Sequence, residues 1–145
     1  MNRSLLIPAA LLLALSACKT VEPPMPAVAP AGTAVVAPAS DVPAQMAAFS
    51  GTWRGKWQRV LDALLVVETV SPTGQVQATY AWADALNWSI HAGSTRLKGQ
   101  ITGNTLQLEP LPDGGKIHYV MRPDGSLDGH YVWGGGPTEG HFVRQ

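Results

Sequence analysis

The side chains best suited to chemistry are histidines, and three of the four lie near the C-terminal end of the sequence. The turn Pro123-Asp124-Gly125 suits a three-residue hairpin loop, which would place His118 opposite His130. If residues 134–137 form a four-residue loop, His141 lies opposite His130 in turn. Three imidazoles in a row across adjacent strands could bind a zinc or copper ion and support a metal-dependent enzyme. The simpler interpretation is three hydrated side chains on a polar face.

Other catalytic patterns are absent from the sequence. It contains no G-x-S-x-G, H-E-x-x-H or phosphate-loop motif, and its only cysteine is Cys18. Asp62 and Asp84 could serve as a pair of acids, but each lies near the end of an expected strand, where a hydrated aspartate is common. We therefore expect a protein that is not an enzyme and that carries no cofactor.

Aromatic side chains dominate the expected interior of the domain. The period of two along a strand places Trp53, Tyr80, Trp82 and Tyr119 on inward faces. These four residues could line a cavity for a small hydrophobic ligand. They could equally fill the core, because an aromatic side chain buries about 150–250 Å² and a small domain without disulfides needs that area.

Glu68 is ambiguous because the turn at residues 71–74 permits two registers. A four-residue loop turns Leu65 and Val67 inward and leaves Glu68 in solvent, and this register is preferred. A three-residue loop instead turns Glu68 into the interior opposite Ala78, where a carboxylate would need a partner. In that case Glu68 becomes a candidate anchor for a ligand.

Residues 1–17 have the order of features found in a secretory signal peptide. A positive charge at Arg3 precedes an apolar run over residues 4–15, which is shorter than the about 20 residues of a lasting membrane-spanning helix. The segment Leu15-Ser16-Ala17-Cys18 resembles the lipobox of bacterial lipoproteins. The resemblance implies cleavage before Cys18, a diacylglycerol thioether on its sulfur and a further acyl chain, such as palmitate, on the new amino terminus.

The same resemblance implies a place in the cell envelope. Residue 19 is Lys rather than Asp, which in such lipoproteins favours the periplasmic face of the outer membrane. The expected partner is therefore a membrane, reached through the lipid on Cys18. Ten basic and ten acidic residues balance, so no general electrostatic attraction to nucleic acid is expected.

Residues 18–45 are composed mainly of Pro, Ala and Val. Repeated proline removes backbone donors and disfavours helix at the residues that precede it. We expect an extended tether without secondary structure, which lets the domain move away from its anchor. The three parts of the chain are then a signal peptide (1–17), a tether (18–45) and a folded domain (46–145).

The folded domain shows the short, regularly spaced strands of an all-β protein. Alternating apolar and polar residues, separated by turn residues, predict antiparallel strands that close into a meander barrel of about eight strands. The expected strands cover residues 51–58, 61–70, 75–83, 88–91, 95–102, 105–109, 116–122, 126–133 and 139–144. Two hairpin registers follow from the turns, with the pairs Ile101–Leu106 and Gly99–Leu108 in one, and Met121–Leu127, Tyr119–Gly129 and Ile117–Tyr131 in the other.

The opening Gly51-Thr52-Trp53, the successive hairpins and the closing Gly140-His141-Phe142 resemble the lipocalin-like and avidin-like barrels grouped as calycins. The resemblance covers the last hundred residues and implies a barrel that holds a small ligand at its open end. We therefore expect a monomeric envelope lipoprotein whose barrel binds a small hydrophobic molecule, a glycan or another envelope protein. The alternatives are an inhibitor of periplasmic proteases or lysozymes, and the metal-dependent enzyme considered above.

Overall fold

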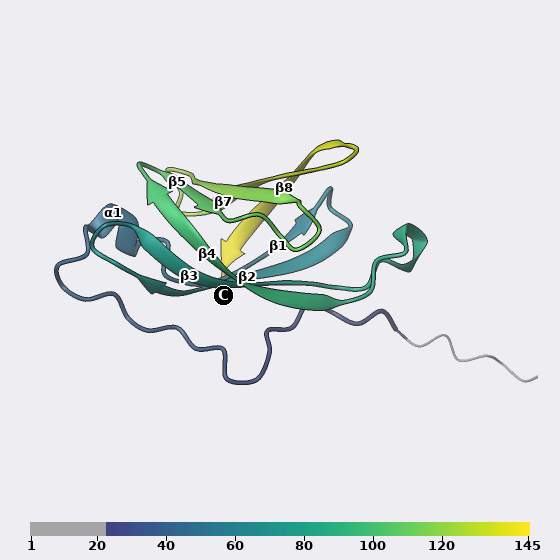
Figure 1. Cartoon of the computed structure of the whole chain (residues 1–145), viewed down its shortest axis with the longest axis horizontal. Coiled ribbons are helices and arrows are strands. Elements are labelled where there is room, and N and C mark those ends of the chain that lie inside the picture. Colours follow the sequence, from purple (N-terminus) through teal and green to yellow (C-terminus); the bar gives the residue numbers. More distant parts are fainter. Residues whose placement is uncertain (1–22) are drawn as a thin grey trace, which may run out of the picture.

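Antiparallel strands that pair in chain order close into a barrel (Figure 1). The computed structural model describes residues 23–145. Within them the last strand pairs with the first, which removes the exposed edges of the sheet. The predicted all-β barrel of about eight strands is confirmed. Its strands are β1 (Gly51–Trp57), β2 (Leu61–Val70), β3 (Gln75–Trp82), β4 (Gly93–Thr102), β5 (Thr105–Leu108), β6 (Lys116–Met121), β7 (Leu127–Trp133) and β8 (Gly136–Arg144).

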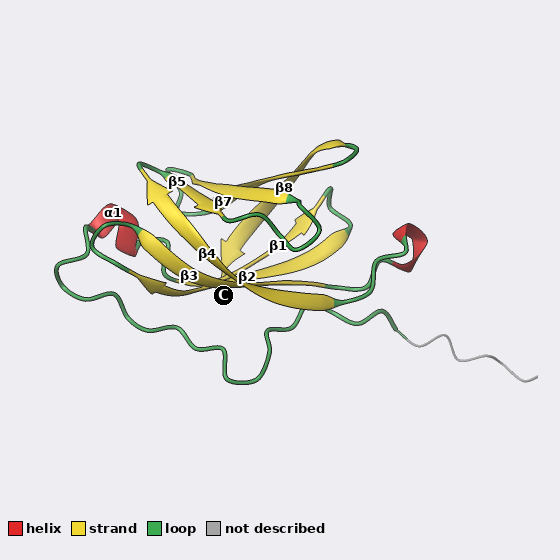
Figure 2. Cartoon of the chain, viewed as in Figure 1, coloured by secondary structure: helices red, strands yellow, loops and turns green. Residues whose placement is uncertain are grey.

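Two short helical turns lie toward opposite ends of the barrel (Figure 2). The α-helix α1 (Ala44–Ala47) precedes β1, and the 3₁₀ turn η1 (Leu86–Trp88) lies in the connection between β3 and β4. The strand expected over residues 88–91 is wrong, because Ser89 adopts a left-handed conformation that ends η1 and leaves only a bridge between Ala85 and Ile90. Neither helical turn of residues 23–145 has the length and apolar character to cross a membrane.

The interior follows the predicted period of two along each strand. On β1 the side chains of Trp53 and Trp57 are buried, and on β4 those of Leu97 and Ile101. The predicted hairpin registers are confirmed, with the pairs Ile101–Leu106, Gly99–Leu108, Met121–Leu127, Tyr119–Gly129 and Ile117–Tyr131. Alternation therefore predicted which side chains enter the core.

Gly55 is where β1 and β8 close the barrel. A Cβ atom at this position would lie 2.6 Å from Cγ of Phe142 and would also collide with the backbone oxygen of His141. The missing side chain lets the Phe142 ring lie against the β1 backbone. Glycine within a strand commonly marks such a close approach.

Residues 25–42 form an extended segment that we call the strap. It runs along the outer face of β2 and β3 before it enters α1 (Figure 1). The segment has no helix or strand, as predicted, but Ala27 is completely buried against Leu64, Val66 and Ala81. The expectation of a free tether is therefore wrong for these residues. The strap also covers part of the outer face of β2 and β3, so that Leu64, Val66 and Ala81 are buried there.

Polar contacts hold the first part of the strap to the barrel. The backbone amide of Ala27 donates a hydrogen bond to Asp62, and its carbonyl accepts one from Arg54. Arg54 and Asp62 are themselves paired at 2.6 Å. Asp84 accepts a hydrogen bond from the amide of Met25. The two aspartates considered as paired acids thus bind the strap, at separate points along it.

The two ends of the barrel differ in how they are covered. The closed end carries α1 and the turns at residues 71–74, 103–104 and 122–126, with Phe49 completely buried beneath them. The open end carries the turns at residues 58–60 and 134–135 and the longer connections 83–92 and 109–115. The longer connections of the open end do not fill it, and it is there that the barrel is hollow.

Candidate ligand-binding site at the open end

The open end of the barrel contains a cavity of about 430 Å³. It lies where β1, β2, β3 and β7 reach their ends at this side, beneath the connections 83–92 and 109–115. Its wall is mostly aromatic and aliphatic. The lining residues are Trp57, Tyr80, Trp82, Trp88, Tyr131, Leu61, Ile90, Leu111, Pro112, Gln58, Asp113 and Thr138.

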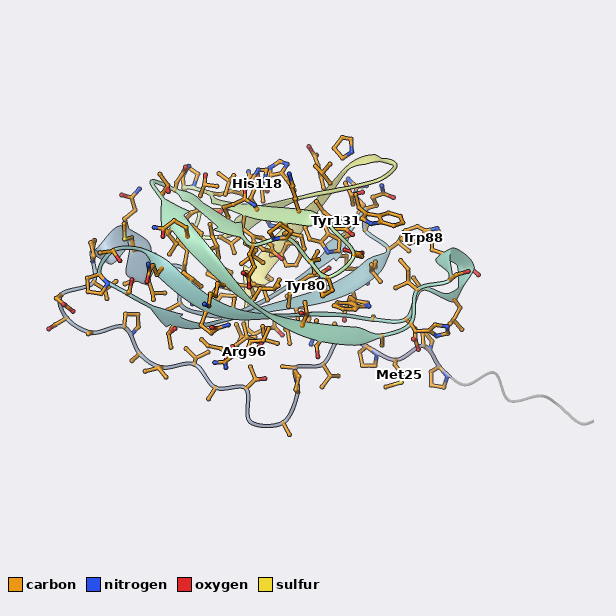
Figure 3. The ribbon with its side chains drawn as sticks, viewed as in Figure 1. Met25, Tyr80, Trp88, Arg96, His118 and Tyr131 are labelled. Atoms are coloured by element: carbon orange, nitrogen blue, oxygen red, sulfur yellow. The ribbon has the colours of Figure 1, made fainter. Side chains whose placement is uncertain are left out.

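Aromatic side chains from three different strands meet in this cavity. The ring of Tyr80 stacks on that of Trp82, with 5.5 Å between the ring centroids, and the ring of Trp57 lies 5.9 Å from that of Tyr131. Figure 3 shows Tyr80 and Tyr131 inside the barrel and Trp88 toward the η1 connection. Rings held by a closed sheet provide a preformed apolar wall.

Hydrogen bonds fix two of these rings and satisfy their polar atoms. Nε1 of Trp57 donates to the hydroxyl of Tyr80 at 2.8 Å, and Nε1 of Trp82 donates to the backbone oxygen of His91 at 2.8 Å. Burial raises the pKa of Tyr80 well above its ordinary value, despite the hydrogen bond from Trp57. Tyr80 is therefore a neutral hydroxyl at physiological pH.

Among the described residues, the cavity wall carries one acidic side chain, Asp113, and no basic one. Oδ1 of Asp113 accepts a hydrogen bond from the amide of Gly115 at 2.9 Å, which holds the carboxylate at the rim. Burial raises the pKa of Tyr131, and the nearby charge of Asp113 raises it further. The electrostatic character of the cavity is thus weakly negative.

The four aromatic residues proposed from the sequence are divided between two places. Tyr80 and Trp82 line the cavity, whereas Trp53 and Tyr119 do not. Tyr119 is completely buried between the rings of Trp57 and Phe142. Among the described residues, its hydroxyl is a buried side-chain group without a hydrogen-bond partner, and burial raises its pKa.

Trp53 belongs to the closed end of the barrel. Its Nε1 donates to the backbone oxygen of Phe49, and the guanidinium carbon of Arg144 lies 4.2 Å from its ring centroid. Arg144 also donates to the backbone oxygens of Ala48 and Ser50, each at 2.6 Å. These contacts tie the last strand to the segment that covers this end, and they are structural.

Several cavity residues were not proposed from the sequence. Trp57 and Tyr131 lie on β1 and β7, and Trp88, Ile90 and Leu111 lie in or beside connections. A signal was present for Trp57 and Tyr131, because both lie near the ends of strands that reach the same end of a meander barrel. Ile90 and Leu111 had no comparable signal, since their place depends on how the connections fold back.

The predicted row of three histidines does not form. His118 and His130 are opposite each other, as predicted, with ring centroids 4.7 Å apart. However, His130 pairs with Glu139, and His141 pairs with Asp128. The register differs because residues 134–135 make a two-residue turn in place of the expected four-residue loop. Consecutive glycines permit such a tight turn.

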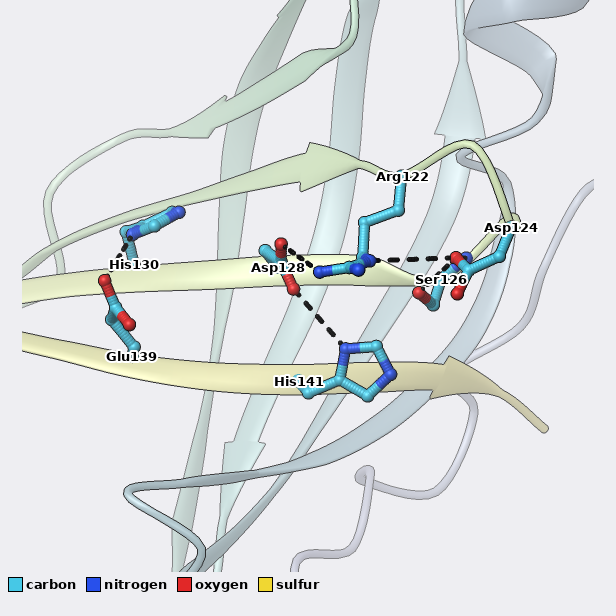
Figure 4. A network of polar contacts seen from close by, with 7 residues as sticks. All are labelled: Arg122, Asp124, Ser126, Asp128, His130, Glu139 and His141. Atoms are coloured by element: carbon cyan, nitrogen blue, oxygen red, sulfur yellow. Dashed lines mark hydrogen bonds and ion pairs between the residues drawn. The ribbon is translucent and has the colours of Figure 1, made fainter.

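His141 takes part in a network of polar side chains on the outer face of β7 and β8 (Figure 4). Nδ1 of His141 lies 3.4 Å from Asp128, which also accepts a hydrogen bond from Arg122 at 2.8 Å.

Burial lowers the pKa of His118, and the neighbouring His130 lowers it further. Within residues 23–145, no three histidine, cysteine, aspartate or glutamate side chains are grouped in a way that could hold a metal ion.

Glu68 lies on the outer face, as the preferred register predicted, but it is not in solvent. Leu65 and Val67 point inward opposite Tyr80 and Ala78, as that register predicted. The expected four-residue loop is wrong, because the register shifts between Val67 and Thr69, so that Val70 pairs with Val76 and the turn has three residues, 72–74. The carboxylate is buried beside the strap, where it accepts hydrogen bonds from Thr79 and Arg96, each at 3.0 Å. Glu68 therefore does not enter the interior of the barrel, and it cannot serve there as the anchor for a ligand.

Comparison with protein-family models and with curated proteins found no match to this chain. The segments expected to be a signal peptide and a lipobox, including Cys18, lie outside the residues that the structure describes.

Proposed function

We propose that this chain is a membrane-anchored envelope lipoprotein whose barrel binds a small, largely apolar molecule at its open end. The lipobox-like segment that ends at Cys18 supports the anchoring. The observation that carries the binding proposal is the aromatic cavity of about 430 Å³ at the open end. This volume falls in the range of about 300–1,000 Å³ that is typical of small-molecule sites.

The lining indicates the chemical class of the ligand. Stacked rings such as Tyr80 and Trp82 contribute apolar contact area, for which each Å² removed from water is worth about 25 cal/mol. The carboxylate of Asp113 lies at the rim with no basic side chain in the cavity wall. A neutral or cationic apolar molecule therefore fits this cavity better than an anionic one.

A pair of fluorescent probes tests this proposal. N-phenyl-1-naphthylamine is neutral and apolar, and 1-anilinonaphthalene-8-sulfonate is a related anion. We expect the neutral probe to bind with a stoichiometry of one and more tightly than the anion. Substituting Trp82→Ala removes one wall of the cavity, and we expect it to weaken binding of the neutral probe about tenfold, which corresponds to about 1.4 kcal/mol.

Two further variants make the test specific. Asp113→Asn removes the negative charge and should reduce the difference in affinity between the neutral and the anionic probe. Val143→Ala changes an exposed apolar side chain on β8 outside the cavity and serves as the matched control, with unchanged affinity. Binding that is unaffected by Trp82→Ala, or no binding of either probe, would contradict the proposal.

A further inference from the structure

Exposed apolar side chains gather on the turns of the open end. Val60 follows β1, Trp133 precedes the turn between β7 and β8, and Leu86 and Trp88 belong to η1. Their exposed fractions are 59%, 54%, 63% and 47%. Figure 3 shows Trp88 beside the outermost connection of this end. Four large apolar side chains on three different connections form one rim, and their exposure costs free energy unless something covers them.

The closed end has a different surface. Its turns at residues 71–74, 103–104 and 122–126 carry none of the large apolar side chains that are exposed in the described part of the chain. These turns instead contain Ser71, Thr73, Asn104 and Asp124. Other exposed apolar residues, such as Val143, lie on the barrel wall or the strap. The asymmetry points to the open end as the surface that meets an apolar partner.

The strap places the N-terminal side of the chain at the same end. Met25 donates its amide hydrogen to Asp84, which lies two residues beyond the open end of β3. Figure 3 shows Met25 and Trp88 on the same side of the molecule. Cys18 precedes Met25 by seven residues, and a chain of that length spans at most about 25 Å. Under the anchoring proposed above, a lipid on Cys18 therefore holds the open end near the bilayer.

From these observations we propose that the open end of the barrel rests on the lipid bilayer, with Leu86, Trp88 and Trp133 in its interface. Tryptophan is well suited to this position because its ring is apolar and its N–H can remain hydrated. The charges around the rim include Arg59, Asp84 and Asp113 and are of both signs. Contact is thus expected with zwitterionic lipid and does not require an anionic surface.

This orientation indicates from which side a ligand enters the cavity. The cavity lies directly beneath the rim, since Trp88 belongs to both. A molecule dissolved in the bilayer could enter the barrel without crossing water. The ligand class that follows is an apolar molecule that partitions into membranes and has a neutral or cationic polar group.

Quenching of tryptophan fluorescence by brominated lipid tests the orientation. The chain from Cys18 onward contains every residue of the described barrel. Its single thiol can be coupled to a maleimide-bearing lipid in phosphatidylcholine vesicles, so the test does not depend on natural lipidation. We expect lipid brominated near its headgroup to quench part of the emission. The double variant Trp88→Phe, Trp133→Phe should lose most of that quenching. Of the tryptophans that remain, Trp53 and Trp57 are buried, and Trp82 lies within the cavity rather than on the rim.

A new tryptophan at the other end provides the matched control. Asn104→Trp, introduced into the double variant, adds an exposed ring at the closed end, and we expect it to stay unquenched. Quenching of this residue equal to that of the wild-type rim, or no quenching of the wild-type chain, would overturn the orientation. Probe binding in solution measures the proposed binding function separately, so the two proposals can fail independently.

Discussion

Met25 and Asp84 are joined by two hydrogen bonds that run in opposite directions. The amide of Met25 donates to Oδ2 of Asp84 at 3.0 Å, and the amide of Asp84 donates to the backbone oxygen of Met25, also at 3.0 Å. Oδ1 of the same carboxylate accepts from the amide of Ala92 at 2.8 Å. One side chain therefore connects the strap, the end of β3 and the long connection at the open end.

Replacing Asp84 should release the beginning of the strap. In Asp84→Ala the amides of Met25 and Ala92 lose their acceptor, and we expect both to exchange hydrogen with solvent faster than in the wild-type chain. The amide of Val36, which donates to the backbone oxygen of Glu68, should be equally protected in the wild-type chain and in Asp84→Ala. Asp41→Ala, at an exposed position of the strap, is the matched control.

The same contact should depend on pH. Hydrogen bonds from the amides of Ala92 and Met25 lower the pKa of Asp84 below its ordinary value of 3.8. Because the folded pKa is lower than the unfolded one, the stabilisation is fully present above the unfolded value and is lost as pH falls through the folded value. Protection of the Met25 amide should therefore be constant from neutral pH down to about pH 5 and decrease in stronger acid. A decrease that begins near neutral pH would contradict this assignment.

Glu68 should stabilise the fold although it is a charged residue under the strap. Its carboxylate accepts hydrogen bonds from Thr79, which is buried, and from Arg96. We expect Glu68→Ala to lower the free energy of unfolding by about 1–3 kcal/mol, because the Thr79 hydroxyl is left without its acceptor. Chemical denaturation measures this change. Glu139→Ala, whose side chain is 81% exposed, should change stability far less.

Tyr119→Phe should stabilise the barrel. The Tyr119 hydroxyl is buried without a partner among the described residues, so removing it eliminates a desolvation cost and leaves the ring contacts with Trp57 and Phe142 in place. We expect a gain of about 1 kcal/mol in the free energy of unfolding. A loss of similar size in denaturant titration would show that the hydroxyl has a partner in solution, such as a buried water.

Arg144 should not be replaceable by lysine. Its planar guanidinium contacts the Trp53 ring and donates to the backbone oxygens of Ala48 and Ser50 at once. A lysine keeps the charge but lacks this fork, so we expect Arg144→Lys to lower the free energy of unfolding by about 1 kcal/mol. Thermal unfolding of both proteins measures the difference, and equal midpoints would show that charge alone suffices.

Much of the barrel could be predicted from local patterns. Alternation along a strand and the lengths of two clear turns determined the registers that pair Ile101 with Leu106 and Met121 with Leu127. Half of the proposed aromatic lining, Tyr80 and Trp82, lines the cavity. These predictions held because inward or outward direction depends only on residue parity and turn length.

Other features depend on packing between distant parts of the chain. Alternation indicates that Trp53 points inward, but not that its ring packs against Arg144 and the segment covering the closed end instead of lining a cavity. The strap has a composition typical of a free linker, and its docking requires the apolar outer residues Leu64 and Val66. Without the strap, the sequence offers no reason for apolar side chains on the outer face of β2, so their partner could not be predicted. The glycine run at 134–136 fits more than one turn, so His141 was placed wrongly.

Backbone amide shifts recorded during titration with N-phenyl-1-naphthylamine test the binding site most directly. The account predicts saturable changes concentrated in residues 57–61, 80–92, 109–115 and 131–138, which surround the cavity at the open end. It predicts little change at the strap or at the closed end, where Trp53 lies. Changes concentrated on the outer face, or no saturable change, would contradict the claim that the barrel binds apolar molecules at its open end.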